Sequence, residues 1–327
     1  MKQAQIGIIG GTGFGDVLLE EASGEVVAVD TPFGAPSSKP ILANWEGVEV
    51  ASISRHGPGH RLNPSKVPYR ANIWAMKELG VSAIVASGAT GSLREDIEPG
   101  HLVLCDQVID KTFLRESTFF DEGLAVHVEL ADPFCPQLRT LLAKAGERVN
   151  AIVHHAGTYV CMEGPQFSTR AESNMHRQWG GDLIGMTCMP EAKLAREAEI
   201  CYALVALPTD YDCWRPHDPC GTDFPVGLPQ DRTAVRQAGK PVPQAGKPAP
   251  QDLLKEILAN LNRATENAIA LIHEALKLME GPLPPCRCRE ALKLAIWSDK
   301  TRIDTAVRQR LDPLIGRYMT DDKNSTP

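Results

Sequence analysis

The sequence predicts an α/β protein: a single domain with a mixed, twisted central sheet flanked by helices, followed by a helical extension at the carboxyl end. Apolar, β-branched runs alternate with helical segments through residues 1–214, and one long amphipathic helix comes later. The composition is typical of a globular chain, with 43% hydrophobic and 23% charged residues. A length of 327 residues allows one large or two ordinary domains.

Seven apolar runs predict the strands, and four periodic segments predict the helices between them. The strands are expected at Gln5–Ile9, Val48–Ser54, Ala83–Ala86, Leu102–Ile109, Tyr159–Met162, Leu183–Met186 and Tyr202–Leu207. The helices are expected at Tyr69–Leu79, Gln137–Val149, Ala171–Trp179 and Glu191–Glu199. Strands interleaved with helices indicate a largely parallel or mixed sheet. We expect one sheet and one domain.

Residues 215–251 differ from the chain on either side. Eight prolines fall between 216 and 250, and QAGKPVP at 237–243 is followed directly by QAGKPAP. Such a composition cannot bury enough apolar surface to offset the entropy of ordering, which predicts a loop. The simplest interpretation is a tolerated surface insertion, and the alternative is a lid or a segment that docks a partner.

Three helical segments follow the inserted loop. Asp252–Met279 carries apolar residues at helical spacing, which predicts a long helix with one apolar stripe. Two shorter helices are expected near Arg289–Ile296 and Thr305–Tyr318. We therefore divide the chain into a main domain, 1–280, that contains the inserted loop, and a carboxyl-terminal helical extension, 281–327.

Charge and apolar patterning limit the partners. The net charge of −7 argues against general binding of nucleic acid, which requires a basic face. The sequence contains neither a run of 18 apolar residues nor an apolar signal core at its start, so we expect no membrane span and a cytoplasmic location.

The nine cysteines are scattered through apolar segments, a pattern typical of buried thiols. The single close pair is Cys286 and Cys288, which follow GPLPP. Without a second pair the spacing does not predict zinc ligation, so we expect no metal site. A disulfide between these two cysteines and two unpaired thiols remain alternatives.

Three glycine-containing segments follow predicted strands and suit an anion. The first, IGIIGGTG at 6–13, lacks the third glycine of a dinucleotide fingerprint and the lysine of a P-loop, but its amides and the Thr12 hydroxyl could bind an anion. The second contains Arg55 and His56, with His60 in the loop beyond, and the third contains Gly88 and Ala89. Ligand crevices of α/β sheets lie beyond the carboxyl ends of strands, so convergence of the three predicts an anion site. The structural alternatives are turn geometry for the glycines and a surface ion pair for Arg55.

Two carboxylates follow the last predicted strand, in TDYDCW at 209–214. If the chain is extended there, Asp210 and Asp212 can both point into a crevice. A carboxylic acid in that place can donate a proton to a ring nitrogen and accept a hydrogen bond from an amine. The structural alternative is a pair of aspartates that cap a loop.

Nine ordered stretches within residues 1–214, a region of about two thirds of the chain, carry a resemblance to a known family. They are GIIGGTG (7–13), DTPFGAPS (30–37), SRHG (54–57), PSKVPYRANIWAMKELG (64–80), GSLREDIEPGHLVLCDQVID (91–110), ADPFCP (131–136), EGPQFSTRAES (163–173), GMTCMPEAKLAREAEICYA (185–203) and TDYDCW (209–214). In this order they resemble the trimeric purine nucleoside phosphorylase family, and within it the branch that acts on 5′-methylthioadenosine. The resemblance implies a nucleoside phosphorylase-like fold and a homotrimer.

The resemblance also assigns roles to residues. It implies phosphate binding by Thr12, Arg55, His56, Gly88, Ala89 and Thr187. It implies nucleoside binding by Phe167, Ser168, Ile184, Met186, His60 and His127, the last from a neighbouring subunit. Asp210 and Asp212 would be catalytic, with Asp210 protonating adenine at N7 and Asp212 close behind. Related enzymes for 6-oxopurines carry asparagine at the Asp210 position, because a carbonyl at C6 needs a donor, whereas an amine needs an acceptor.

The implied activity is the reversible phosphorolysis of 5′-methylthioadenosine to adenine and 5-methylthioribose 1-phosphate, a pentosyl transfer in purine and methionine salvage. Inorganic phosphate would be the co-substrate, and no cofactor is expected. Three alternatives stay open: a phosphorylase for 6-oxopurine nucleosides such as inosine, guanosine or methylthioinosine, a hydrolytic nucleosidase on the same fold, and a non-catalytic purine-binding protein that docks partners through 215–251.

Overall fold

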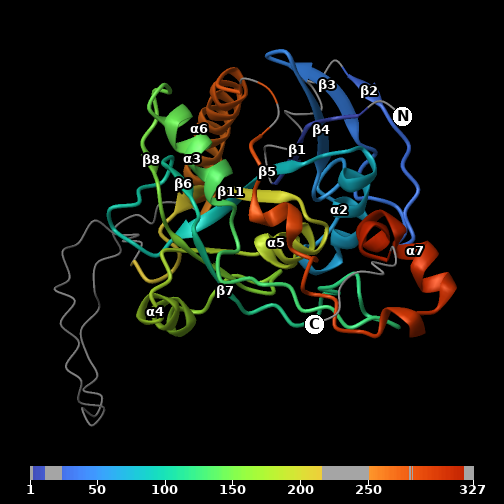
Figure 1. Cartoon of the computed structure of the whole chain (residues 1–327). Helices are drawn as coiled ribbons and strands as arrows, with labels where there is room; N and C mark the ends of the chain where they lie inside the picture. Colours follow the sequence, from blue (N-terminus) through green and yellow to red (C-terminus); the bar gives the residue numbers. More distant parts are fainter. Residues whose placement is uncertain (1–2, 12–23, 216–249, 280, 282, 320–327) are drawn as a thin grey trace, which may run out of the picture.

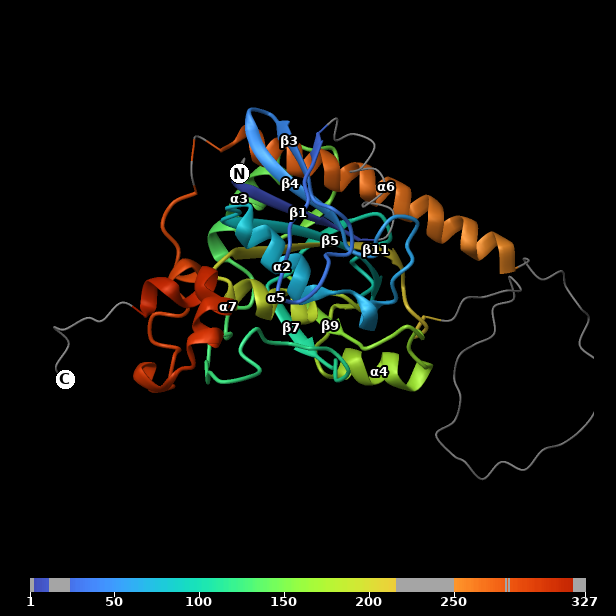
Figure 2. The ribbon, with the colours of Figure 1, turned by 90° about the vertical axis from the view of Figure 1, so that its right-hand side faces the viewer.

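The computed structural model describes residues 3–11, 24–215, 250–279, 281 and 283–319. These residues form one mixed sheet between two layers of helices (Figure 1 and Figure 2). The strands are β1 (Ile6–Gly10), β2 (Glu25–Val26), β3 (Ile41–Trp45), β4 (Val48–Ser54), β5 (Ala83–Ser92), β6 (Leu102–Leu104), β7 (Gln107–Asp110), β8 (Val153–His154), β9 (Thr158–Cys161), β10 (Leu183–Gly185) and β11 (Cys201–Asp210). The helices are α2 (Tyr69–Glu78), α3 (Pro136–Gly146), α4 (Arg170–Gln178), α5 (Cys188–Glu197), α6 (Pro250–Lys277) and α7 (Thr305–Ile315).

Four parallel strands form the centre of the sheet, in the order β4-β1-β5-β11. Their side chains alternate between two apolar cores, since successive residues of a strand point to opposite faces. In β11, Ala203 and Val205 pack with α3 and α6 on one face, whereas Tyr202 and Leu204 pack with α2 and α5 on the other. Burial on both faces explains why these strands are apolar runs in the sequence.

The predicted α/β class and mixed sheet are confirmed, and a strand lies at each of the seven predicted ranges. Two ranges were wrong in detail. Leu102–Ile109 forms two short strands, β6 and β7, which pair with different neighbours. The run at Ala83–Ala86 does not end in a turn: β5 continues through Gly88 to Ser92 because β11 pairs with it along that length. The strand β3, which pairs antiparallel with β4, was not among the predicted strands.

The extension after α6 packs against the main body. Leu292, Leu311 and Ile315 are buried in the same core as α2 and α5, and Figure 2 shows α7 beside these helices. The expected helix at Thr305–Tyr318 is confirmed as α7 and a following 3₁₀ turn at Gly316–Tyr318. The division of the chain at residue 280 stays a prediction.

The helix expected at Arg289–Ile296 is wrong. A 3₁₀ turn at Arg287–Glu290 leads into further turns there. Two backbone groups of this segment bond to distant partners: the Leu292 N–H donates to Glu199, and the Ala295 carbonyl accepts from the His127 N–H. These tertiary bonds replace the ladder that a helix would form.

Most of the expected loop at 215–251 lies outside the described residues.

All eight described cysteines are free thiols and six of them are buried, which confirms the interpretation as buried thiols. Within the described ranges, none of the helices has the length and apolar character needed to cross a membrane.

Candidate active site

A cavity of about 440 Å³ lies where β1, β4 and β11 end and beside the second half of β5. That volume suits a small-molecule ligand. Twelve of the fourteen predicted site residues line it: Arg55, His56, His60, Gly88, Ala89, Phe167, Ser168, Ile184, Met186, Thr187, Asp210 and Asp212. The convergence expected from the separate motifs is therefore present in the fold.

Arg55 forms one end of the cavity and is fully buried. Its Nε and Nη2 donate to the two carboxylate oxygens of Glu191, at 2.8 and 2.7 Å, and its Nη1 donates to the Ser87 carbonyl at 2.7 Å. Burial alone would lower the pKa of Arg55, but the Glu191 carboxylate and its hydrogen bonds outweigh burial and raise it. The alternative of a surface ion pair is wrong, because both side chains of the pair are inaccessible to solvent.

Glu191 is the residue that sequence reasoning missed at this end. It lies on α5 and also accepts a 2.7 Å hydrogen bond from the Tyr202 hydroxyl. The pairing joins positions 136 residues apart, so no local spacing points to it. The one local indication of a special role for Glu191 is its place in MPEAK (189–193), where a glutamate lies among residues of an apolar helix face.

At Gly11 the main chain comes close to Arg55 and to β5, as expected of a glycine-rich segment. A side chain at this position would bring a Cβ to 2.9 Å from Nη1 of Arg55 and 2.9 Å from the carbonyl oxygen of Ser87. The main chain after β1 can therefore lie against Arg55 and β5 because residue 11 has no Cβ. Thr12 lies outside the described residues, so its predicted phosphate contact stays a prediction.

His56 and His60 stack beside Arg55, with ring centroids 4.2 Å apart. Burial lowers the pKa of His56 to about 4, although its hydrogen bond to the Leu62 carbonyl opposes this shift. The neutral ring must carry its proton on Nδ1, because that atom lies 2.8 Å from a carbonyl oxygen, which can only accept. Nε2 is then an acceptor. His56 can therefore accept a hydrogen bond from a protonated ligand atom, but it adds no positive charge to the site.

Gly88 and Thr187 face each other across the same end. A Cβ on Gly88 would lie 3.6 Å from Oγ1 of Thr187, in ordinary van der Waals contact. Thr187 is buried and directly precedes α5. Its hydroxyl and the neighbouring β5 backbone provide a neutral, polar wall next to Arg55.

The two aspartates form the opposite end. Asp210 is the last residue of β11, and its carboxylate accepts from the Thr209 hydroxyl and from the Asp212 N–H, both at 2.8 Å. Asp212 adopts the left-handed backbone conformation, with φ of +50°, and its carboxylate accepts a 2.5 Å bond from Ser173. Asp212 therefore orients Asp210 through its backbone, while Ser173 fixes the second carboxylate.

Apolar side chains cover the space between the two ends. Ile184 and Met186 come from β10 and the residue after it, and Phe167, which is 83% exposed, lines the rim of the cavity. The long helix α6 adds Ile257, Leu258 and Leu261, which were not among the predicted site residues.

His127 does not line the cavity of its own chain. Its N–H donates to the Ala295 carbonyl, and its ring lies 4.5 Å from that of Trp297 on the extension. The predicted role across a subunit boundary is not tested by one chain and stays a prediction.

Glu163, of the EGPQFS motif, anchors the loop that carries Phe167. It accepts hydrogen bonds from the main-chain N–H groups of Phe113 and Leu114, and it pairs with Arg115 at 3.1 Å. Burial alone would raise the pKa of Glu163, but these bonds and one from Ser65 lower it to about 2.

Comparison with known proteins agrees with this geometry. A model of the phosphorylase superfamily matches residues 5–277. The S-methyl-5′-thioadenosine phosphorylase of Geobacter sulfurreducens is 42% identical over 318 residues, which are 96% of this chain and 99% of that protein.

Solved structures give the same result. A methylthioadenosine phosphorylase from an antarctic soil metagenomic library has a TM-score of 0.80 and 40% identity, covering 96% of this chain and 99% of that one. A variant of the adenosine/methylthioadenosine phosphorylase of Schistosoma mansoni, in complex with methylthioadenosine, has a TM-score of 0.70 and 30% identity over 96% and 98% of the two chains. The chain therefore belongs to the phosphorylase superfamily and, within it, to the S-methyl-5′-thioadenosine phosphorylases.

Proposed function

We propose that this protein catalyses the reversible phosphorolysis of 5′-methylthioadenosine, giving adenine and 5-methylthioribose 1-phosphate. The observation that carries the proposal is that one cavity has Arg55 at one end and Asp210 at the other. The apolar wall between them suits a nucleoside, whose sugar would lie between an anion and a base. Homologues with this activity match nearly the whole chain.

The Arg55 end would bind inorganic phosphate as the co-substrate, without a cofactor. Because Glu191 balances the charge of Arg55 and His56 is neutral, binding would depend on oriented donors more than on net charge. We assign the main-chain groups near Gly88 and Ala89 and the Thr187 hydroxyl to this role. The Nε2 atom of His56 would accept a hydrogen bond from the protonated oxygen of hydrogen phosphate.

Reaction begins with stretching of the bond between C1′ and N9, which leaves positive charge on the sugar and negative charge on adenine. A phosphate oxygen forms the new bond to C1′, and the electron pair of the broken bond stays on the base. The phosphate dianion, bound at the buried end of the cavity, stabilises the sugar cation. Protons balance overall, because hydrogen phosphate loses one as it becomes the ester and adenine gains one.

The Asp210 end would recognise adenine. The carboxyl group of Asp210 would protonate N7 and accept a hydrogen bond from the C6 amine, and the backbone of Asp212 would hold it in position. A 6-oxopurine presents an acceptor where adenine presents a donor, so Asp210 disfavours the alternative of an inosine or guanosine phosphorylase.

The 5′ end of the nucleoside would lie against Leu258 and Leu261 of α6 and near His60. An apolar surface at that place favours a methylthio group over a hydroxyl. We further propose that the protein acts as a homotrimer in the cytoplasm, with His127 of a neighbouring subunit completing the 5′ pocket.

The experiment is an assay of adenine release from 5′-methylthioadenosine, with and without phosphate, with inosine alongside. Phosphate-dependent release of adenine and no turnover of inosine is the expected result. Release without phosphate would make the protein a nucleosidase, and no release would favour a purine-binding protein. Sedimentation of the same preparation tests the trimer.

A further inference from the structure

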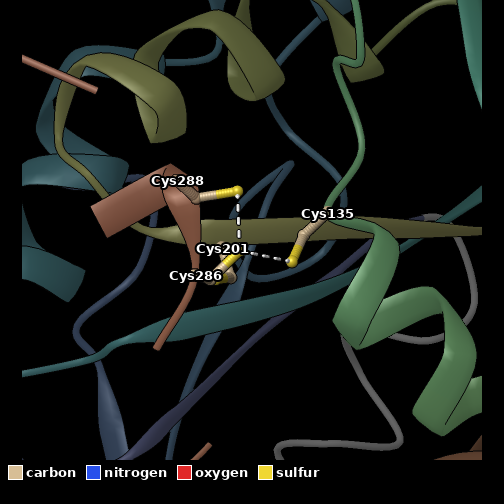
Figure 3. A group of neighbouring side chains, drawn as sticks. All are labelled: Cys135, Cys201, Cys286 and Cys288. Carbon is tan, nitrogen blue, oxygen red and sulfur yellow. Dashed lines mark hydrogen bonds between the residues drawn. The ribbon is translucent and has the colours of Figure 1, made fainter. Parts of the chain in front are cut away.

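Four cysteines that are far apart in the sequence meet outside the active site (Figure 3). Cys135 directly precedes α3, Cys201 is the first residue of β11, and Cys286 and Cys288 belong to the extension after α6. Their sulfur atoms all lie within 4.8 Å of one another. The Sγ atom of Cys286 is 3.5 Å from those of Cys135 and Cys288.

These separations match a tetrahedral metal centre. A zinc ion binds thiolates at about 2.3 Å, so the sulfurs of a four-cysteine site lie about 3.8 Å apart along each edge of the tetrahedron. A disulfide would bring two sulfurs to about 2.05 Å. Within the described residues this is the single group of three or more metal-ligating side chains that converge in this way.

The surroundings suit a structural ion. Cys135, Cys201 and Cys288 are at most 3% exposed, and Cys286 is half-buried. Cys135 lies at the amino end of the 11-residue helix α3, where the helix dipole stabilises a thiolate.

We propose that Cys135, Cys201, Cys286 and Cys288 bind one zinc ion as a four-thiolate centre that fastens the extension to β11 and α3. Four protein ligands fill the tetrahedron, so the ion has a structural role and no open position for substrate. The expectation of no metal site rested on the lack of a second cysteine pair. The fold supplies that pair from Cys135 and Cys201, which no local spacing reveals.

The first test is the zinc content of the full chain, purified in reducing buffer without added metal and measured by mass spectrometry of the element. We expect about one zinc per chain in the wild type and below about 0.1 in the Cys286→Ser/Cys288→Ser variant. The matched control is Cys213→Ser, which removes a thiol outside the cluster and keeps its hydrogen-bond donor to the Ser168 carbonyl. The control is expected to retain its zinc.

A second measurement does not depend on the folding of the variant. Wild-type protein reconstituted with Co²⁺ is expected to show the visible absorption of tetrahedral cobalt bound to thiolates, and a chelator is expected to remove the metal and lower the melting temperature. Wild type that contains no zinc and gives no cobalt spectrum overturns the proposal. So does a disulfide among these four cysteines in protein kept reduced throughout, or equal zinc in the double variant.

Discussion

The two ends of the cavity are built differently. At the phosphate end, Arg55 and Glu191 are fully buried and hydrogen-bonded to each other, and Thr187 is buried beside them. At the nucleoside end, Phe167 is 83% exposed and Leu258 is 48% exposed. The first end is part of the protein core, whereas the second is a surface that a ligand or a neighbouring subunit can cover.

The difference predicts which property each end controls. Groups at the phosphate end stabilise the fold as well as bind, since a charge buried without its partner is costly. Groups at the nucleoside end can change with little effect on the fold and should mainly alter substrate choice.

The largest effect is expected for Asp210→Asn at the nucleoside end. The amide keeps the size of the side chain but cannot protonate N7, and it presents a donor to the adenine amine. We expect kcat/KM for 5′-methylthioadenosine to fall by about 10³- to 10⁴-fold, with little change in melting temperature. Near wild-type turnover would refute the acid role, and an equal loss of stability would contradict the separation of the two ends.

The second prediction concerns Glu191→Ala at the phosphate end. Removal of the carboxylate leaves Arg55 buried without an ion pair, so the free energy of unfolding should fall by about 3–5 kcal/mol. Phosphate binding should weaken at the same time, because Glu191 fixes two nitrogens of the guanidinium. Denaturant unfolding and the phosphate dependence of the rate measure the two effects.

The matched control is Glu197→Gln, on the same helix. Glu197 is also buried, but its carboxyl group accepts from the Thr118 hydroxyl and the Phe119 N–H. Loss of one such hydrogen bond is expected to cost about 1 kcal/mol. If the free energy of unfolding falls equally in the two variants, the ion pair between Arg55 and Glu191 stabilises the fold no more than an ordinary buried hydrogen bond does.

The sequence predicted the parts of this arrangement that depend on local patterns. The bounds of β4 agree with the prediction residue for residue, because its apolar run ends at Ser54 directly before Arg55. The converging motifs predicted the edge of the sheet at which the cavity lies. The glycine-rich pattern around Gly88 predicted a turn, and this was wrong. These residues belong to β5 because they pair with β11.

Features that depend on distant pairing could not be predicted. The bond between Arg55 and Glu191 and the cluster around Cys135 each join residues that only the finished fold brings together. The same holds for the segment at Arg289–Ile296, in which apolar spacing suggested a helix. Its buried residues are instead positioned by Glu199 and His127, neither of which lies in the segment.

The third prediction concerns pH and the anchor behind the nucleoside end. Glu163 has a pKa of about 2 in the fold, below its ordinary value of about 4.5, so the unfolded chain binds more protons between these pH values. Its contribution, on the order of 3 kcal/mol, is present above about pH 4.5 and is lost as the pH falls toward 2. We expect Glu163→Gln to be less stable near pH 7 and to lose less stability on acidification.

Unfolding by denaturant between pH 3 and pH 7 measures this dependence. The control is Glu95→Gln, which changes an exposed carboxylate and should leave the slope as in the wild type. A slope in Glu163→Gln equal to that of the wild type would show that the loop carrying Phe167 is not held by this charge.

The smallest effect is expected for Leu258→Ala, in the exposed wall of the cavity. Loss of a half-exposed leucine should change the free energy of unfolding by less than about 1 kcal/mol. If α6 forms the 5′ subsite, kcat/KM for 5′-methylthioadenosine should fall about 3- to 10-fold, while that for adenosine, which has no methylthio group, should change less. The matched control is Leu294→Ala, since Leu294 is 88% exposed and does not line the cavity. Equal losses on the two nucleosides would place the 5′ group elsewhere, and the selectivity of the site would then depend on the neighbouring subunit alone.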